Sequence, residues 1–539
     1  MTKYSVERLD HLGVVAGTIK DLGLIELIDS HLGKFEGEKL SAGETVAGMI
    51  LNGLGFSDKP ISLTPLFFRN CPLSLLFREG VDAEDFNRFK IGRVMDRAHA
   101  FGTETLFYEA AKHCCEREGI DLTFNHLDTS TFSLTGEYLP DSDEQAILIN
   151  HGHSKDHRPD LKQAALEMMV SQDGNIPILC KILDGNSSDN TVFRERANAL
   201  AEEFRRSDMP RYLIADCKLY TEKNSGNLAG LPFITRIPQN IKKVQEIITR
   251  AVEHPDAWRE FDNDRKVQVF GLEHYGIKQR WCVVSSETSR AGAVRRTEKK
   301  AEKEKKGVER QLARLRAVRF HCTEDAVKAA EDLSGKWTLR KLAGYKVVEH
   351  RHYKNKGRPG KNTRPDSVLY QIIAESEPDG EMLDRLRETS ACYVTGTNIS
   401  REELATQEII DGYRSQDSVE QGFRFLKDPL FFTSSLFLKK PSRISALLMI
   451  MVLSLMVYGI AERRMRNCLA EQRETLPDQI NRPVSAPTLR WIFQLLNGIS
   501  RIRIAAGDHV SYILEGISEL RKKILLLFGN TVATIYQVS

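Results

Sequence analysis

The chain has 539 residues and the composition of an ordinary folded protein, with 41% hydrophobic and 28% charged residues. Its formal net charge of +3 gives no overall sign of a nucleic-acid partner, so any basic surface must be local. The nine cysteines contain no C-x-x-C pair, which argues against a disulfide framework or a zinc ribbon and favours reduced thiols. Charged residues stand at the N-terminus where a signal peptide has an apolar run, so we expect a cytoplasmic protein.

The first part of the chain, residues 1–118, predicts an all-α domain. Apolar residues recur at helical spacing over residues 14–32, in a stretch that begins at residue 42, and over residues 86–116. No catalytic group is evident in these patterns. A helical interaction domain and a DNA-binding module fit them equally well.

The pattern changes to strands near residue 122. The first strand carries Asp128 in its middle, and the pair Asp173-Gly174 is a typical hairpin turn between the next two. A later short strand ends in Asp216. The predicted elements are strands at 122–134, 164–171 and 176–183, a helix through 192–204, and strands at 212–216 and 231–238.

This order, three antiparallel strands followed by parallel strands reached through helices, is that of a ribonuclease-H-like core. It puts Asp128 inside the first strand and Asp216 at the end of the fourth, and functional groups in open α/β sheets collect at such strand ends. The core needs a final helix with a third acid, which has not appeared by residue 238. We therefore expect residues 119–238 to form the first part of an interrupted α/β core.

Residues 239–390 predict a β-rich insertion into that core. Residues 289–318 predict a long helix. Its mixed charges favour a solvated or coiled-coil-like helix over a DNA-binding arm. A basic loop at 354–364 fits a solvent loop, and also a contact in a DNA minor groove. The end of the core is expected at 391–470, and C-terminal helices, at 489–504 and 512–528, within 471–539.

The stretch at residues 444–460 is nearly all apolar and close to the lower limit for a membrane-spanning helix. It stands alone and contains two serines and a glycine. Because a core helix of a large protein can be apolar on every side, we expect a buried core helix and no membrane contact.

The polar stretch from Tyr413 to Lys427 carries the third acid. Read as one helix, Tyr413, Gln416, Glu420, Arg424 and Lys427 follow at steps of three, four, four and three residues, and so share one face. A surface ion-pair cluster fits this mixture of groups, and so does a metal ligand among phosphate-binding groups. The upstream acids favour the metal ligand.

Three carboxylates from two neighbouring strands and one helix would make an oxygen-rich site, which hard divalent cations prefer. Mg²⁺ takes one or two carboxylates per ion and leaves room for phosphate oxygens. Two such ions roughly 3.5 to 4 Å apart can stabilise the attacking and leaving oxygens of an in-line phosphoryl displacement. Asp128, Asp216 and Glu420 are therefore the predicted catalytic and metal-binding residues.

Taken together, the motifs resemble the DDE transposases of bacterial insertion sequences, and more closely the branch with a Y-R-E-K signature, a β-rich insertion and an N-terminal helical domain. The resemblance covers essentially the whole chain. Of the signature Y-x2-R-x3-E-x6-K, Tyr413, Glu420 and Lys427 fit, while Gln416 stands at the arginine position. The other segments that carry the resemblance are 126–138, 152–162, 215–220 and 233–238.

The resemblance implies an enzyme that cuts double-stranded DNA at transposon terminal inverted repeats and transfers the 3′ end into target DNA. It implies two Mg²⁺ ions per site, with Mn²⁺ as a substitute, a homodimer or larger assembly on paired ends, and association with the nucleoid when DNA is bound. Contacts with DNA are implied for Tyr413 and Lys427, with Arg414, Gln416 and Arg424 beside them. Two alternatives stay open: a nuclease of the same fold without strand transfer, and a transposase-derived DNA-binding protein that has lost catalysis.

Overall fold

The computed structural model describes residues 2–57, 59–138, 146–187, 211–354, 360, 364–431, 438–506 and 509–538. The chain divides into two compact units. The first unit consists of Met1–Thr235 and Asp411–Ser539, and the second unit of Arg236–Ile410. All the predicted site residues belong to the first unit.

Five neighbouring strands, in the order β4-β3-β2-β5-β6, run through the centre of the first unit. β2 (Phe124–Leu134) pairs antiparallel with β3 (Lys162–Ser171), and β3 with β4 (Pro177–Leu183). On its other side β2 is parallel to β5 (Tyr212–Ala215), which is parallel to β6 (Phe233–Arg236). These strands confirm the prediction of a mixed α/β fold, whereas the helix predicted through 192–204 lies outside the described residues.

Helices of the N-terminal region form as predicted, with one division. The helix expected at 14–32 is split at Gly23, whose φ of 64° is a left-handed conformation that glycine adopts without strain. A capping box between Ser41 and Glu44 begins the third helix. The longer helices are α1 (Leu12–Leu22), α2 (Leu24–Leu32), α3 (Ala42–Leu54), α6 (Arg88–Phe101) and α7 (Thr103–Glu118), and the short ones are α4 (Thr64–Phe68) and α5 (Leu73–Leu76).

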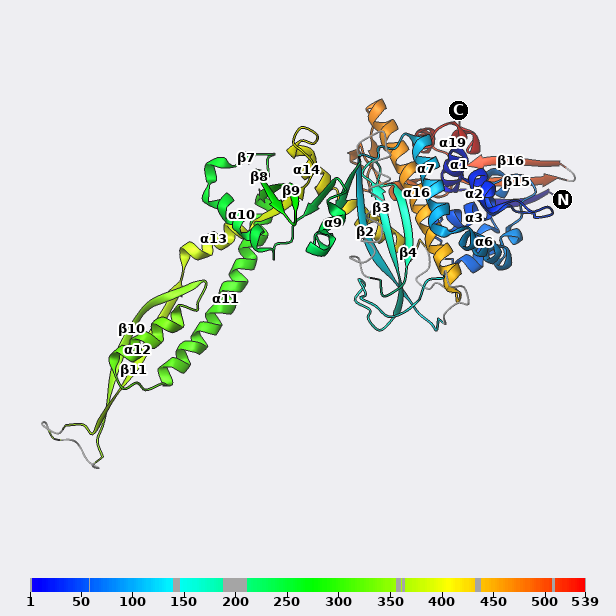
Figure 1. Cartoon of the computed structure of the whole chain (residues 1–539). Helices are drawn as coiled ribbons and strands as arrows, with labels where there is room; N and C mark the ends of the chain where they lie inside the picture. Colours follow the sequence, from blue (N-terminus) through cyan, green and yellow to red (C-terminus); the bar gives the residue numbers. More distant parts are fainter. Residues whose placement is uncertain are drawn as a thin grey trace. The chain divides into compact units, whose positions relative to one another are not determined.

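The apolar helix α16 (Pro441–Gln472) is the core of the first unit (Figure 1). It is long and apolar enough to cross a membrane, yet 94% of its most apolar window is buried inside the protein. It contacts α1, α3, α6, α7 and β4. An ion pair of 2.7 Å between Arg443 and Asp96 attaches it to α6, and another of 2.6 Å between Arg464 and Glu118 attaches it to α7. The predicted buried core helix is confirmed.

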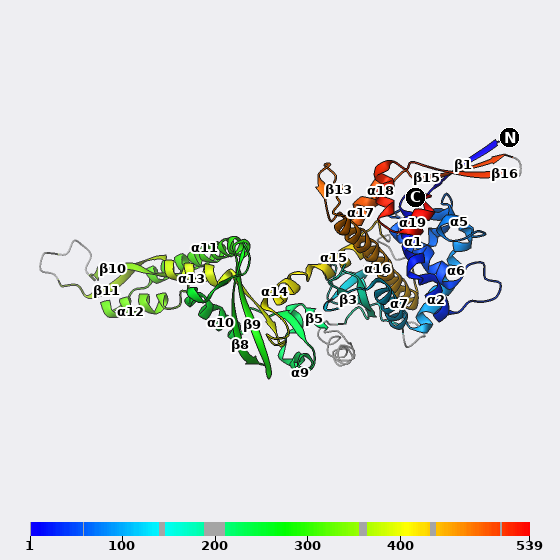
Figure 2. The ribbon, with the colours of Figure 1, turned by 90° about the horizontal axis from the view of Figure 1, so that it is seen from above.

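The two ends of the chain meet in a small antiparallel sheet that the sequence did not lead us to expect. β1 (Thr2–Arg8) pairs with β15 (Ser500–Ala506), which pairs with β16 (His509–Glu515) (Figure 2). The predicted all-helical termini are wrong here, since residues 500–506 alternate with a period of two and find their partner at the opposite end of the chain. The C-terminal helices are α17 (Leu489–Leu495), α18 (Glu519–Leu526) and α19 (Asn530–Ile535).

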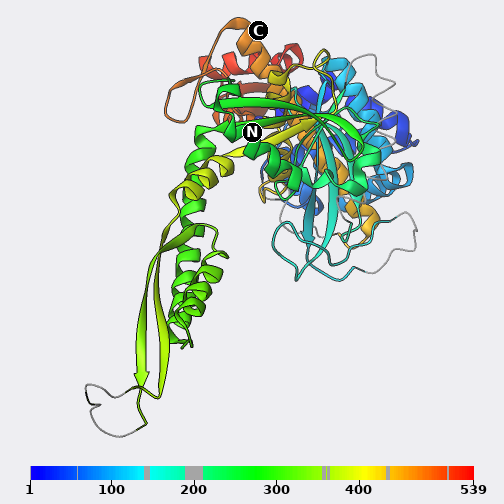
Figure 3. The same cartoon turned by 60° about the vertical axis from the view of Figure 1, so that its left-hand side comes forward.

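The second unit contains four antiparallel strands and a helix-backed hairpin. The predicted long charged helix is confirmed as α11 (Glu287–Ala317), which lies beside a hairpin of two further strands (Figure 3). Most of the basic loop predicted at 354–364 lies outside the described residues. The strands are β12 (Cys392–Thr397), β9 (Ile277–Ser286), β8 (Arg265–His274) and β7 (Arg259–Glu260), and the hairpin is β10 (Arg340–His352) with β11 (Ser367–Pro378).

Candidate active site

The two strand acids lie at neighbouring positions of adjacent parallel strands. The register pairs Leu127 of β2 with Ala215 of β5, and the next residue along each strand is Asp128 or Asp216. Neighbouring strands are about 4.8 Å apart, so the two acids stand side by side at the end of β5. Both side chains are half-buried. The sheet thus brings together two residues that are far apart in the sequence.

Each of these carboxylates accepts a hydrogen bond from the backbone N–H that follows it. The bond from Thr129 to Asp128 Oδ1 measures 2.8 Å, and the bond from Cys217 to Asp216 Oδ1 measures 2.5 Å. Lys155 Nζ lies 3.6 Å from Asp128 Oδ1 and donates a hydrogen bond of 2.8 Å to Thr129 Oγ1. Sequence reasoning missed Lys155 as a site residue, although its loop belongs to a segment that carries the family resemblance.

The stretch with the third acid forms two helices rather than the single predicted helix. α14 (Thr406–Arg414) ends before a tight turn, closed by a 3.1 Å hydrogen bond from Gln416 N–H to the Tyr413 carbonyl, and α15 (Asp417–Leu426) follows. A turn of this tightness has three residues instead of 3.6, so the common face predicted across it is interrupted. Tyr413 and Arg414 belong to α14, Glu420 and Arg424 to α15, and Lys427 is the C-cap of α15.

Gln416 attaches the beginning of α15 to the strand that carries Asp128. Its Oε1 lies 3.2 Å from Nδ1 of His126, and its Nε2 donates to the carbonyl of Leu127 at 3.4 Å. Burial lowers the pKa of the fully buried His126, so the neutral ring can donate from Nδ1 to the amide oxygen. Since Leu127 precedes Asp128, this contact sets α15 beside the acid.

Glu420 lies on the first turn of α15 and is exposed. Val419, Phe423 and Leu426 of α15 are buried, and the helix contacts β2, β3 and α16. In the part of the chain that the structure describes, no three His, Cys, Asp or Glu side chains are grouped so that they could hold a metal ion. The structure therefore brings the two aspartates together and puts Glu420 on the helix packed against β2, without closing a three-carboxylate group.

The cations of the signature stretch differ in their surroundings. Lys427 Nζ donates to Asp156 Oδ1 at 2.6 Å and lies 5.6 Å from the centre of the Phe132 ring. Arg414 and Arg424 are exposed, and neither forms an ion pair with any residue of the described ranges. These two guanidinium groups are accessible to an incoming anion.

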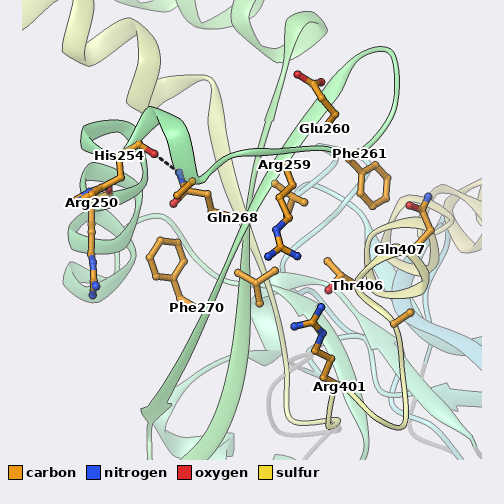
Figure 4. Close-up of a pocket in the computed structure, with 14 residues that line it drawn as sticks. Arg250, His254, Arg259, Glu260, Phe261, Gln268, Phe270, Arg401, Thr406 and Gln407 are labelled. Carbon is orange, nitrogen blue, oxygen red and sulfur yellow. Dashed lines mark hydrogen bonds between the residues drawn. The ribbon is translucent and has the colours of Figure 1, made fainter.

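A second concave surface, in the second unit, gathers arginines. A cavity of about 700 Å³ is lined by Arg250, Arg259 and Arg401 together with Phe261 and Phe270. The guanidinium groups of Arg259 and Arg401 point toward each other across it, and Arg250 lies 5.8 Å from the centre of the Phe270 ring (Figure 4). None of the three arginines pairs with a carboxylate within the described residues. The facing guanidinium groups of Arg259 and Arg401 favour binding of an anion such as phosphate, although the carboxylate of Glu260 also lines the cavity.

A family comparison decides what kind of protein has this site. A family model described as a transposase DDE domain matches residues 128–457, from the first acid through α15 and into α16. The chain belongs to the DDE transposase family. Members of this family bind DNA and generally use divalent metals such as Mg²⁺. The resemblance to DDE transposases noted from the sequence is thus confirmed, and the narrower Y-R-E-K branch stays a prediction.

Other comparisons add less about this transposase. Residues 4–112 match a model described only as a domain of unknown function, and no curated protein matches the chain. Among solved structures, the chain is similar to a piggyBac transposase synaptic complex with hairpin DNA, at 8% identity over 99% of this chain and 84% of that chain. The TM-score of 0.33 is too low to establish a shared fold, so the family assignment depends on residues 128–457.

Proposed function

We propose that this transposase cleaves DNA strands at transposon ends and joins the freed 3′ end to target DNA. The proposed catalytic domain is a ribonuclease-H-like core into which the second unit is inserted. The observation that supports it best is the register that sets Asp128 beside Asp216 at the parallel edge of β2 and β5. Glu420, from the helix packed against β2, is the proposed third acid.

The donor groups at this edge suit divalent cations. Asp128 and Asp216 offer carboxylate oxygens, the ligands that Mg²⁺ prefers. The position beside Asp128 attracts a cation even without a metal, since the ammonium of Lys155 lies 3.6 Å from it. Asp128, Asp216 and Glu420 would hold two Mg²⁺ ions, with Mn²⁺ as a substitute. Bound ions would lower the pKa of water and stabilise negative charge on the phosphate oxygens of the cut strand.

The remaining polar groups have the proposed task of binding and orienting DNA. The exposed guanidinium groups of Arg414 and Arg424, with Tyr413 and Lys427 near them in the chain, supply phosphate contacts beside the acids. In the second unit, the arginine-lined cavity supplies a further surface for the DNA backbone. By analogy with its family, the protein acts on terminal inverted repeats as a homodimer or larger assembly, in the cytoplasm and on nucleoid DNA.

The test is cleavage and joining of a labelled duplex taken from the flanks of the coding sequence, with Mg²⁺. Asp216→Asn and Glu420→Gln should each lose on the order of 10²-fold or more in rate, as expected when a group that stabilises transition-state charge is removed. Asp417→Asn, an exposed acid on the same helix as Glu420, is the matched control and should keep wild-type activity. Equal cutting by wild type and the two acid variants would contradict the proposal. Cutting without joining would instead support the alternative of a nuclease without strand transfer.

A further inference from the structure

Two neighbouring residues in the loop between β2 and β3 contact opposite parts of the candidate site. Lys155 Nζ donates hydrogen bonds to the carbonyl and hydroxyl oxygens of Thr129 and lies 3.6 Å from Oδ1 of Asp128, in the middle of β2. Asp156 Oδ1 accepts a 2.6 Å hydrogen bond from Lys427 at the end of α15. Two consecutive residues, Lys155 and Asp156, thus pair with the proposed catalytic acid Asp128 and with Lys427 of the signature.

This loop is held in place by its own hydrogen bonds. The N–H of Lys155 donates to Thr131 Oγ1 at 3.0 Å. The buried hydroxyl of Ser154 accepts bonds from the N–H groups of Asp156, at 3.3 Å, and of Arg158, at 3.1 Å. Since these bonds fix the backbone, the positions of the two side chains follow from the fold rather than from chance contact on an open surface.

The contact between Lys155 and Asp128 involves the same carboxylate that the proposed function assigns to a metal. The exposed fractions of the two side chains are only 23% and 25%, so water screens their charges incompletely. An ammonium group and a divalent cation repel each other and cannot share one carboxylate oxygen. An ammonium group is also a good point-charge ligand for phosphate.

We propose that Lys155 exchanges between two anions, with its ammonium on Asp128 before a divalent cation binds there and on a DNA phosphate afterwards. This inference depends on the proposed function, because it takes Asp128 to be a metal ligand. Asp156 holds Lys427 more closely, by a hydrogen bond, so both lysines lie beside protein carboxylates until metal and DNA arrive. Because of this exchange, a bound divalent cation raises the affinity for DNA, and bound DNA raises the affinity for the divalent cation.

The first test measures Mn²⁺ binding to the full-length protein without DNA, by electron paramagnetic resonance. Lys155→Ala removes the competing cation and should tighten Mn²⁺ binding about two- to fivefold, the range expected for a partly exposed ion pair. Lys181→Ala, with the same change of charge on β4, is the matched control and should leave the affinity unchanged. Asp128→Asn should weaken Mn²⁺ binding.

The second test measures the affinity for a labelled duplex by fluorescence anisotropy. With Ca²⁺ present, Lys155→Ala should bind DNA about five- to tenfold more weakly and lower the salt dependence by about one phosphate contact. With EDTA the same variant should bind DNA like wild type, and Lys155→Arg should retain most of the affinity. A purely structural lysine would instead weaken Mn²⁺ and DNA binding together.

The outcomes separate this inference from the proposed function. Suppose that Asp128→Asn weakens Mn²⁺ binding and that Lys155→Ala leaves the Mn²⁺ affinity unchanged or lowers it. The proposed exchange is then wrong, while the proposed metal site is supported. If Asp128→Asn leaves Mn²⁺ affinity unchanged, the proposed metal site is wrong, and the exchange falls with it. Should Lys155→Ala fail to fold, Lys155→Met keeps the side-chain volume and is judged by the same two measurements.

Discussion

The hydrogen bonds that join the start of α15 to β2 can be removed with one substitution, Gln416→Ala. The amide makes two hydrogen bonds, of 3.2 Å with His126 and 3.4 Å with the Leu127 carbonyl. Both are long, so each contributes toward the low end of the usual range of about 0.5–1.5 kcal/mol. Leaving the buried Nδ1 of His126 without a partner costs more, so the free energy of unfolding should fall by about 1–3 kcal/mol.

The loss of activity should exceed the loss of stability. Gln416 precedes α15 and Leu127 precedes Asp128, so without the amide Glu420 is free to shift relative to Asp128. A misplacement of about 1 Å in a catalytic group can cost about 10²-fold in rate. We therefore expect transposon-end cleavage to fall by one to two orders of magnitude, while DNA affinity stays within about twofold because the amide contacts β2.

Calorimetry, cleavage of the labelled end and anisotropy measure the three quantities on the same preparation. Gln421→Ala, an exposed glutamine on α15, gives the same truncation without the contact and should resemble wild type in all three. A variant at Gln416 with unchanged melting temperature and about tenfold weaker DNA binding would refute this reasoning. It would favour instead the direct DNA contact that the signature position predicts for Gln416.

Two further predictions concern charge. The Arg443 guanidinium lowers the pKa of Asp96 below the ordinary 3.8, so the stability from this pair is present above about pH 4 and is lost as the pH falls through the folded-state value. The melting temperature of Asp96→Asn should lie below that of wild type near pH 7, and the difference should shrink in acid. In the second unit, the double variant Arg259→Glu with Arg401→Glu should weaken DNA binding and lower the salt dependence by about two phosphate contacts. Arg314→Glu, outside the cavity, should change anisotropy titrations much less, and an equal effect would argue against a local site.

Local patterns predicted the strands of the first unit because each strand carries its own signal. A change to a strand pattern near residue 122 indicated β2, the Asp173-Gly174 turn indicated the β3–β4 hairpin, and a short strand that ends in an acid indicated β5 and Asp216. The parallel pairing of β2 with β5, which makes Asp216 a neighbour of Asp128, followed from the order of elements. The family and the position of Asp128 beside Asp216 were therefore accessible from the sequence.

What the sequence did not reveal depends on contacts between distant segments. Residues 500–506 alternate with a period of two, but the helical patterns around them led to a helix prediction. The partner strand β1 lies at the other end of the chain, so no nearby segment indicated a sheet. The break before α15 lies at Ser415 and Gln416, residues that do not by themselves end a helix, and it becomes visible only with the hydrogen bonds of Gln416. Lys155 lay in a segment that had been noted for its resemblance, but its place on Asp128 depends on how a loop folds back on β2.

The position of α16 near the end of the sequence has a consequence for synthesis on the ribosome. The helices α1, α3, α6 and α7 contact one another, but the faces that they turn to α16 stay uncovered until the chain has grown past Pro441. At about 5–20 residues per second, synthesis from the end of α7 at Glu118 to Pro441 takes roughly 15 to 65 seconds. Chains that stop before residue 441 should be cleared by proteases rather than accumulate. The amount of active transposase would then depend on how many ribosomes complete the message.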